Sequence, residues 1–396
     1  MLKELNCPKC GGSLDVDENQ RIVKCGFCGS SSVLKLDNGK PKLKIEQQPY
    51  KPESDSLISL LDLKVYYKIA GGLFSAAKYI RAVDGVSLGI EKGETLGLVG
   101  ESGCGKSTLG KAILRLTEPT GGKVFYNGKD LAHLPQAAMR EQRKDLQMIF
   151  QDPYASLNPR MTVGNIIGEP IRTFSLANGK SVELKVQELM ETVGLSRRFV
   201  KRYPHEFSGG QRQRIGIARA LAVDPKFIVA DEPISALDVS IQAQIMNLME
   251  RLQAEKNLTY LFISHDLRAV RHLSDRVAVM YLGRIVELAD GKEVYKDPLM
   301  PYTKALISAV PVPDPEIEAA RQRIILIGDV PSPINPPSGC PFHTRCQYAI
   351  SECKEIVPKL VEIKPLHQAA CIRISSEHPN IDENVKSGRK VVGNEN

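Results

Sequence analysis

A glycine-rich stretch at residues 100–107 carries the residue types that bind phosphate. It fits the spacing G-x-x-x-x-G-K-[ST], with Lys106 and Ser107 at its end. Glycines let consecutive backbone N–H groups curl around phosphate oxygens, and the helix expected after the loop points its positive end at them. Lys106 is expected to reach the β- and γ-phosphates of a nucleotide, and Ser107 to ligate Mg²⁺. The predicted nucleotide-binding set is Gly100, Glu101, Ser102, Gly103, Cys104, Gly105, Lys106, Ser107 and Thr108.

A second candidate site follows the apolar stretch at residues 227–230. Two carboxylates, Asp231 and Glu232, come directly after it. A buried parallel strand would place Asp231 at the carboxyl edge of the sheet, beside the phosphate loop, where it can hold Mg²⁺. Glu232 would then polarise the attacking water. Taken by themselves, the two carboxylates could simply be a solvated acidic turn at the end of a strand. Because the chain also has a phosphate loop, the catalytic interpretation is favoured.

Apolar patterning predicts the elements that must position these residues. Residues 95–99, 227–230 and 260–263 are apolar runs of buried-strand length. Residues 83–90 are also strand-like, whereas residues 182–193 place apolar side chains at helical spacing. Strands that alternate with helices predict a parallel sheet with helices on both faces, so the expected fold class is α/β.

The composition is that of a globular chain with room for two domains. It has 396 residues, of which 42% are hydrophobic and 25% charged. The formal net charge of +7 is mild and does not by itself indicate nucleic acid. No run approaches the roughly 20 apolar residues that span a bilayer, and residues 1–10 lack a signal-peptide region, so a cytosolic chain is expected. Nine cysteines in such a chain indicate metal or redox chemistry before disulfides.

Four further motifs resemble those of ATP-binding cassette (ABC) ATPases, and the whole set follows that family's order. Residues 207–214 (Phe-Ser-Gly-Gly-Gln-Arg-Gln-Arg) resemble the family's signature sequence, and Gln151 resembles its Q-loop glutamine. Residues 235–238 (Ser-Ala-Leu-Asp) resemble the D-loop, and His265 resembles the switch histidine. The resemblance extends over about residues 57–291. It implies a P-loop NTPase cassette with a RecA-like core, an antiparallel β subdomain and a helical subdomain at about residues 152–207.

The same resemblance implies how ATP is bound and hydrolysed. Two cassettes would pack head to tail, so that the signature helix of one directs a second positive end at the γ-phosphate held by the other. His265 and Gln151 would sense the γ-phosphate and position the water for Glu232. Tyr67 is expected to stack on adenine, with Tyr66 nearly as good a candidate, and a core or surface role for Tyr67 stays open. The remaining residues expected at the shared ATP site are Ser208, Gly209, Gly210, Gln211 and Asp238.

Segments outside the core narrow the resemblance to one group of importers. The chain is similar, over about residues 57–373, to the second ATPase subunit of oligopeptide/dipeptide (and nickel) importers; the segments that carry this likeness are 152–160, 301–306, 311–315 and 328–340. It implies uptake of di- or oligopeptides through a separate integral-membrane permease, served indirectly by an extracellular solute-binding protein. The chain would lie on the inner face of the cell membrane and pair with a second related ATPase, or with itself. Tyr154 and Pro159, after Gln151, would grip a cytoplasmic helix of the permease.

Two alternatives to peptide import stay open. The same kind of ATPase could drive uptake of nickel or another small solute, because the ATPase touches no cargo. A soluble cassette that acts on ribosomes or nucleic acid is the second alternative, favoured by the positive charge and the N-terminal cysteines. Translation-type cassettes usually come two to a chain, and repair-type cassettes insert long coiled coils for which residues 152–207 are too short. Direct contact with nucleic acid is therefore not expected.

Two C-x-x-C pairs stand near the N-terminus, Cys7 with Cys10 and Cys25 with Cys28. Each pair presents two thiolates from a tight turn, and together they make the tetrahedral S₄ site that suits Zn²⁺. A module this small cannot fold on apolar burial alone, so zinc is expected to hold it together. The pattern resembles a zinc ribbon and is foreign to the importer ATPases.

A second group of cysteines has no C-x-x-C spacing and consists of Cys340, Cys346, Cys353 and Cys371. Four thiolates suit a zinc or an iron–sulfur site, and buried structural thiols are the alternative. The peptide-importer ATPases that this region resembles carry a [4Fe–4S] cluster on such a set, so a cluster away from the ATP site is predicted. The predicted organisation is a zinc ribbon at 1–36, a linker at 37–56, the cassette at 57–297, a C-terminal domain at 298–374 and a disordered tail at 375–396.

Overall fold

The computed structural model describes residues 56–69, 77–311 and 323–381 with their side chains, together with the backbone of five short strands before them. The chain divides into two units, Met1–Lys51 and Pro52–Asn396. The strands of the first unit are β1 (Lys3–Asn6), β2 (Ser13–Val16), β3 (Ile22–Lys24), β4 (Ser31–Asp37) and β5 (Lys40–Lys44). β1 pairs with β2, and β3, β4 and β5 form an antiparallel sheet in that order.

Strand β5 occupies residues 40–44 of the predicted linker at 37–56, whose residues 45–55 lie outside the described part of the chain. Proline and polar residues suggested an unstructured segment, yet β5 pairs with β4 in antiparallel register, with Pro41 opposite Leu36. β5 lies at the edge of its sheet, where proline is tolerated because the outer side of the strand needs no hydrogen-bond partner. The predicted zinc ligands lie outside the described residues; they are Cys7, Cys10, Cys25 and Cys28.

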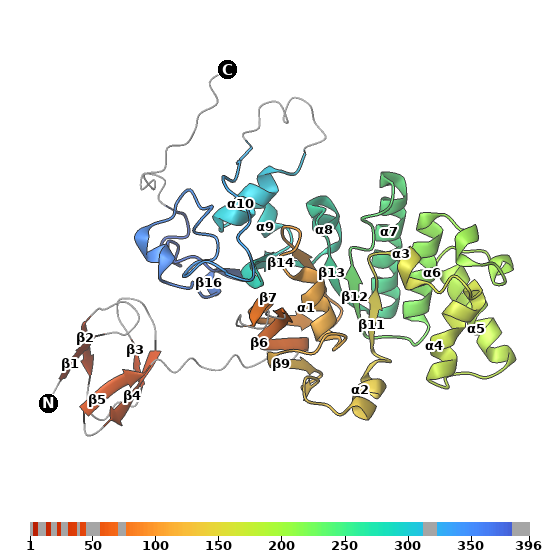
Figure 1. Ribbon diagram of the computed structural model, residues 1–396, viewed down its shortest axis with the longest axis horizontal. Coiled ribbons are helices and arrows are strands. Elements are labelled where there is room, and N and C mark those ends of the chain that lie inside the picture. Colours follow the sequence, from red (N-terminus) through yellow and green to blue (C-terminus); the bar gives the residue numbers. More distant parts are fainter. Residues whose placement is uncertain are drawn as a thin grey trace, which may run out of the picture. The chain divides into compact units, whose positions relative to one another are not determined.

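The second unit is built on an eight-stranded sheet (Figure 1). The first five strands in its order, β11-β12-β13-β8-β14, are parallel, and the last three, β15-β17-β16, run antiparallel to their neighbours. Their bounds are β8 (Thr95–Val99), β11 (Leu146–Ile149), β12 (Phe227–Asp231), β13 (Thr259–Ile263), β14 (Arg276–Tyr281), β15 (Arg284–Asp290), β16 (Val361–Lys364) and β17 (His367–Ala369). The predicted parallel α/β sheet is thereby confirmed.

The central strands send side chains into two hydrophobic clusters, one on each face of the sheet. In β12, Ile228 and Ala230 belong to one cluster, whereas Phe227 and Val229 belong to the other. A strand covered on both faces must be apolar throughout, which explains why its sequence does not alternate with polar residues. Helix α1 (Lys106–Ile113) contributes to the second cluster, and helices α7 (Val239–Lys256) and α8 (Leu267–Leu273) contribute to the first.

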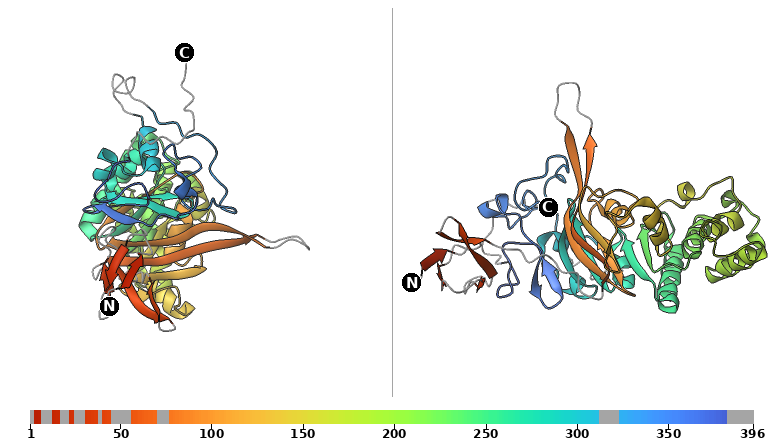
Figure 2. Two further views of the ribbon diagram at one scale, coloured as in Figure 1. Left: turned by 90° about the vertical axis from the view of Figure 1, so that its left-hand side faces the viewer. Right: turned by 90° about the horizontal axis from the view of Figure 1, so that it is seen from below.

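A four-stranded antiparallel sheet packs against α1, as the cassette resemblance implied. Its order is β10-β9-β6-β7, and its two long strands, β6 and β7, extend from the cassette as a twisted ribbon (Figure 2). Their length follows from the many β-branched and aromatic residues of both stretches. The bounds are β6 (Ser56–Ile69), β7 (Lys78–Glu91), β9 (Gly121–Tyr126) and β10 (Lys129–Asp130).

Helices occupy most of the chain between β11 and β12, at the opposite end of the cassette from the C-terminal region (Figures 1 and 2). The helix predicted at residues 182–193 is α5, which buries Val182, Val186, Leu189 and Met190 on one face. The helices of this part and the one before it are α2 (Gln136–Gln142), α3 (Pro153–Ser156), α4 (Val163–Thr173), α5 (Lys180–Thr192), η1 (Arg197–Phe199), η2 (Pro204–Glu206) and α6 (Gly209–Leu221).

The C-terminal region is part of the cassette sheet, which corrects the separate domain predicted at residues 298–374. β17 pairs with β15, and β16 pairs with β17. The fully buried Glu287 ties this region down, because its carboxylate accepts hydrogen bonds from the N–H groups of Leu299 and Met300 and lies 2.7 Å from Nε2 of His367. The remaining elements are α9 (Glu293–Lys296), α10 (Pro301–Ser308) and η3 (Ser351–Lys354).

The predicted tail at residues 375–396 is described as far as Ile381. The Ile381 side chain is buried and packs in the larger hydrophobic cluster, so the chain up to that residue belongs to the folded unit. Residues 382–396 lie outside the described part of the chain.

Candidate functional site

The phosphate loop connects the end of β8 to the start of α1, as its sequence predicted. Gly105 has a φ of 110°, and a Cβ there would lie 2.0 Å from the carbonyl oxygen of Ala82. Only glycine fits that position without moving the backbone. Gly103, with a φ of 76°, has no atom within 4 Å of its would-be Cβ, so the loop is open on that side. The loop therefore combines a tightly packed backbone at Gly105 with open space at Gly103.

Lys106 and Ser107, the predicted phosphate and Mg²⁺ contacts, are the first two residues of α1. The Lys106 side chain is buried, and its Nζ donates hydrogen bonds to the carbonyls of Gly100 at 2.8 Å and Glu101 at 3.0 Å. Ser107 Oγ donates to Oδ1 of Asp231 at 2.8 Å, so the end of β12 and the start of α1 come together as predicted.

Asp231 and Ser107 together form an oxygen donor set that fits Mg²⁺. Burial raises the pKa of Asp231, and the hydrogen bond from Ser107 offsets that effect only in part. A buried carboxylate with a raised pKa gains most from a nearby cation, which would stabilise its charged form. Carboxylate and hydroxyl oxygens are also the ligands that Mg²⁺ prefers. The residues present therefore fit a Mg²⁺ ion held by this pair.

Two of the three predicted catalytic residues, Gln151 and His265, approach one carboxylate oxygen of the third, Glu232. Oε2 of Glu232 accepts a hydrogen bond from Nε2 of Gln151 at 2.9 Å and lies 3.3 Å from Nδ1 of His265. They come from the ends of three strands, β12, β11 and β13, which are neighbours in the sheet. Glu232 has a φ of 46°, a left-handed conformation that is unfavourable for glutamate and is typical of functional sites. Its N–H is held by the carbonyl of Ile263 at 2.9 Å.

The signature residues form the start of helix α6 in the helical region. Ser208 and Gln211 make a reciprocal capping box, in which the Ser208 N–H donates to Oε1 of Gln211 at 3.0 Å. Ser208 is exposed and Gly209 is partly buried. Gly210 is buried, and a Cβ there would lie 2.4 Å from Ile241. A capped helix start with small residues can receive an anion from another molecule.

Asp238 caps helix α7 rather than facing the phosphate loop of its own chain. Its Oδ1 accepts hydrogen bonds from the N–H of Ile241 at 3.0 Å and from Oγ of Ser240 at 2.8 Å. These bonds hold the pKa of Asp238 below its usual value. The residue therefore fixes the shape of the D-loop, and a contact across a cassette dimer remains a prediction.

The two tyrosines considered for adenine stacking have different environments in the structure. The Tyr66 hydroxyl donates to Asp84, which also pairs with Arg284 at 2.6 Å, and burial together with the bond to Asp84 raises the pKa of Tyr66 to about 12. Tyr67 is 41% exposed on the next position of β6. An exposed ring has a free face for stacking, so the geometry favours Tyr67 over Tyr66.

Two residues at the phosphate loop were missed by sequence reasoning. The Glu101 N–H donates to the Tyr302 hydroxyl at 2.9 Å, and the Glu101 carboxylate pairs with Arg345. Tyr302 lies in the segment 301–306 that resembles importer ATPases, which is the one signal that could have pointed to it. Arg345 has no such signal, because it is 244 residues from its partner. This contact links the C-terminal region to the phosphate loop, whereas the position of the cysteine group away from the ATP site stays a prediction.

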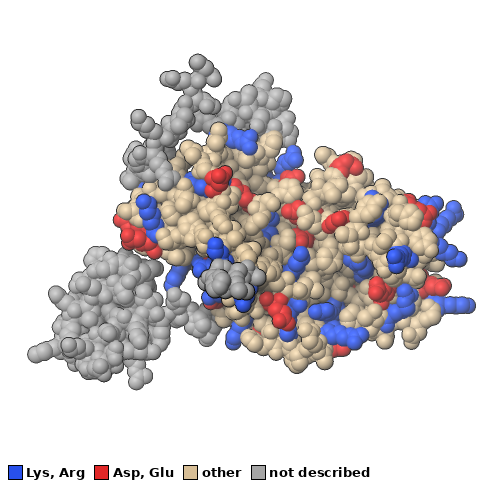
Figure 3. Space-filling view, in the orientation of Figure 1, with Lys and Arg blue, Asp and Glu red and all other residues tan. Residues whose placement is uncertain are grey.

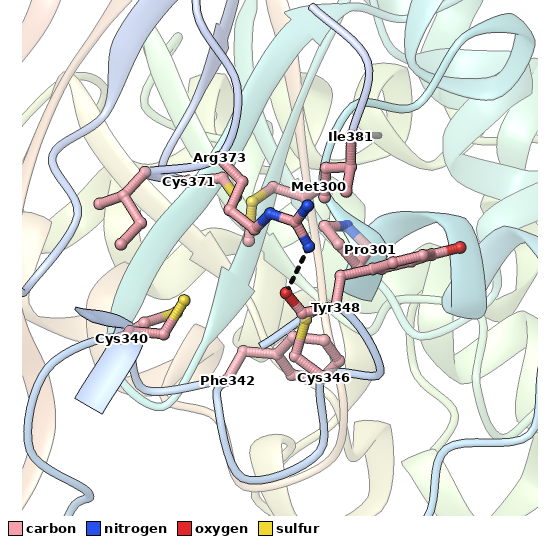
Figure 4. A pocket seen from close by; sticks show the side chains of 11 residues that line it. Met300, Pro301, Cys340, Phe342, Cys346, Tyr348, Cys371, Arg373 and Ile381 are labelled. Carbon is pink, nitrogen blue, oxygen red and sulfur yellow. Dashed lines mark hydrogen bonds between the residues drawn. The ribbon is translucent and has the colours of Figure 1, made fainter. Parts of the chain in front are cut away.

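The C-terminal cysteines lie around one small apolar cavity of about 20 Å³, which has room for about one water molecule (Figure 4). Burial raises the pKa of Cys340 to about 11 and of Cys346 to about 12, so both thiols are neutral near pH 7. Within the described part of the chain, no three potential ligands are arranged to hold a metal ion. The donor type and number suit a thiolate site, but a group larger than a water molecule would require the side chains to move apart. The four cysteines are Cys340, Cys346, Cys353 and Cys371.

Comparisons with known proteins agree with this geometry. Residues 83–235 match the family model of the ABC transporter, and residues 286–353 match that of the oligopeptide/dipeptide transporter, C-terminal region. The oligopeptide transport ATP-binding protein AppF of Bacillus subtilis is 56% identical over 319 residues, which cover 80% of this chain and 97% of that protein. The oligopeptide transport ATP-binding protein OppF of Salmonella typhimurium is 54% identical over 322 residues, covering 80% of this chain and 96% of the relative.

A solved structure supports the fold. The dimeric post-hydrolysis structure of the ATP-binding cassette MJ0796, bound to ADP and Pi, superposes with a TM-score of 0.54 and is 29% identical. The match covers 59% of this chain and 98% of that one. The chain therefore belongs to the ABC transporter ATPases, in the family of the oligopeptide transport ATP-binding proteins.

Proposed function

We propose that this chain hydrolyses ATP to drive the uptake of di- or oligopeptides through a separate membrane permease. The observation that carries the cargo class is the match of residues 286–353 to the C-terminal region of oligopeptide/dipeptide transporters. The phosphate loop, the Asp231–Ser107 pair and the carboxylate of Glu232 supply the chemistry. Nickel or another small solute is the alternative cargo, since none of these residues touches what is transported.

The mechanism follows from the positions of the chain's own groups. The backbone N–H groups of the loop and Lys106 would hold the β- and γ-phosphates, and Ser107 and Asp231 would hold Mg²⁺. When bound, Mg²⁺ supplies positive charge to the phosphate oxygens. Glu232 would accept a proton from the water as that water attacks the γ-phosphorus and ADP leaves. Gln151 and His265, which both reach Glu232, would orient the water.

The second half of the ATP site is proposed to come from another cassette. The start of α6, with Ser208 exposed and Gly209 partly buried, supports this, because a capped helix end offers its positive end to the γ-phosphate of a partner. The partner is a second related ATPase, or another copy of this chain.

The permease contact is proposed at Tyr154, on α3 just after Gln151. Tyr154 is 63% exposed, and the guanidinium of Arg212 lies 3.9 Å from the centre of its ring. The Arg212 stack holds the ring in place on the surface. Arg212 belongs to α6, so a permease helix that contacts Tyr154 would be coupled through Arg212 to the signature helix. No described helix is long and apolar enough to cross a bilayer, and a peripheral position on the inner face of the cell membrane is proposed.

We expect this subunit to co-purify from its native membrane with permease subunits and a second, related ATPase. The reason is its likeness to one member of a two-ATPase importer. Mild detergent extraction, affinity capture and mass spectrometry of the eluate would identify the partners. If the permease is recovered with this chain as its one kind of ATPase, the ATPase pair is a homodimer, and the transport function is still supported.

Recovery with ribosomes or DNA and without a permease would overturn the transport function. On the face drawn in Figure 3, Lys and Arg side chains are interspersed with Asp, Glu and uncharged residues. Nucleic-acid interfaces concentrate basic side chains, so this face does not favour the alternative.

Two metal sites are also proposed. Each N-terminal C-x-x-C pair directly follows a strand, β1 or β3, whose antiparallel partner begins three residues after the second cysteine, which supports a Zn²⁺ ribbon on Cys7, Cys10, Cys25 and Cys28. The gathering of four thiols around one cavity supports a [4Fe–4S] cluster on Cys340, Cys346, Cys353 and Cys371.

Anaerobic purification is expected to yield brown protein with iron, acid-labile sulfide and about one zinc per chain. Cys346→Ser should lower the iron and sulfide content while zinc stays, and Cys7→Ser should do the reverse. Elemental analysis and the visible absorption spectrum measure both. Colourless protein with two zinc ions and no iron would refute the cluster and leave two zinc sites.

A further inference from the structure

The C-terminal region reaches the phosphate loop through a two-pronged ion pair. Nη1 and Nη2 of Arg345 donate to Oε2 and Oε1 of Glu101 at 2.7 and 3.0 Å. The Arg345 side chain is 7% exposed and that of Glu101 is 24% exposed. Parallel, partly desolvated bonds of this kind are among the strongest that an arginine makes. Glu101 is the second residue of the phosphate loop, so the pair acts on the loop directly.

All three polar parts of Glu101 are engaged. Its N–H donates to the Tyr302 hydroxyl at 2.9 Å, its carbonyl accepts from Nζ of Lys106 at 3.0 Å, and its carboxylate is held by Arg345. Glu101 therefore connects the C-terminal region to Lys106, the residue expected to contact the β- and γ-phosphates.

The carboxylate of Glu101 poses an electrostatic problem for ATP binding. It adds a negative charge to a loop that must receive a triphosphate, and like charges at short range repel. Arg345 carries the charge that cancels it, and its pKa is raised by the bond to Glu101, so it stays protonated.

The other end of this connection is the cysteine-lined cavity. Arg345 directly precedes Cys346, and its N–H donates to the carbonyl of Phe342 at 3.0 Å. The Phe342 ring borders the same cavity and packs 5.4 Å from the ring of Tyr302. The segment that carries the cysteines thus contacts the phosphate loop directly through Arg345, and its Phe342 packs against Tyr302, which makes the second contact.

We propose that Arg345 is a positioning residue for ATP binding, which acts through Glu101. It neutralises the carboxylate within the phosphate loop and holds the loop backbone that orients Lys106. The C-terminal region is in this way a working part of the nucleotide site, although it contributes no group that touches ATP.

Titration of the purified full-length chain with a fluorescent ATP analogue and Mg²⁺ tests the proposal. Arg345→Gln is expected to weaken binding about 5- to 20-fold, because Glu101 keeps an uncompensated charge. Arg345→Lys keeps the positive charge but loses the two-pronged contact, so its affinity should lie between those of the wild type and Arg345→Gln. Lys364→Gln is the matched control, since it removes the basic partner of Asp297 in the same region and should leave the affinity unchanged.

The double variant Glu101→Gln with Arg345→Gln separates charge compensation from general damage. Removing both charges is expected to bring the affinity back to within about twofold of Glu101→Gln alone. A purely structural role for Arg345 would leave the double variant as weak as Arg345→Gln. Wild-type affinity in Arg345→Gln, or no recovery in the double variant, would overturn the proposal. If Arg345→Gln fails to fold, Arg345→Lys is compared directly with the wild type: a lower affinity supports the role of the two-pronged contact, and unchanged affinity would overturn the proposal.

Discussion

Glu232→Gln is expected to keep ATP binding and to lower the rate of ATP hydrolysis by a factor of about 10²–10⁴. The amide preserves the shape of the side chain and can still contact Gln151 and His265, but it cannot accept a proton from the attacking water. Phosphate release by the assembled transporter complex measures turnover, and a nucleotide-binding titration on the same preparation measures affinity. The two readouts should separate, with turnover lost and affinity retained.

A matched control for that variant is Glu118→Gln, which removes a surface carboxylate whose side chain is 76% exposed. It should leave both readouts unchanged. Hydrolysis by Glu232→Gln at the wild-type rate would show that another group activates the water. A parallel loss of binding and turnover would instead indicate that Glu232 holds the structure of the site, a role that its left-handed backbone would then explain.

Much of the cassette could be predicted because its central strands are buried on both faces. The runs at residues 95–99 and 227–230 are apolar without alternation, and they became β8 and the body of β12. Glycine-rich turns and paired carboxylates at strand ends then placed the phosphate loop and Asp231 together, as the Ser107–Asp231 bond shows. Local patterns sufficed here because each strand's burial determines its composition.

Short antiparallel strands gave no such local signal. β16 and β17 have four and three residues, and their place in the core sheet depends on the distant contact between Glu287 and His367. The run at residues 324–327 shows the converse: it is apolar and of strand length, yet it forms no regular element and leaves Ile325 74% exposed. Apolar composition predicts burial only where a neighbouring element is available to cover it.

The parts of the candidate site that the sequence did not predict are contacts between residues far apart in the chain. The motifs predicted Lys106, Asp231, Glu232, Gln151 and His265, and the geometry brings the last two onto Glu232. No spacing rule relates Arg345 to Glu101. Their pairing depends on the fold of the whole C-terminal region, so no local sequence pattern predicts it.

Lys106→Ala is expected to weaken the binding of MgATP by about 10- to 100-fold, since a hydrogen bond to a charged group contributes about 1.5–3 kcal/mol. The side chain also bonds the carbonyls of Gly100 and Glu101, so a small loss of thermal stability should accompany the change. Equilibrium titration measures the affinity, and a thermal melt without nucleotide checks that the variant is folded.

Lys92→Ala provides the matched control for the lysine, because Lys92 is exposed in the turn between β7 and β8 and should bind ATP as the wild type does. The comparison with Glu232→Gln is the decisive one. Loss of affinity in Lys106→Ala, together with retained affinity and lost turnover in Glu232→Gln, would assign binding to the phosphate loop and chemistry to the end of β12. A folded Lys106→Ala protein with wild-type affinity would show that the phosphates are held by the loop backbone alone, and the role given to the lysine would have to be withdrawn.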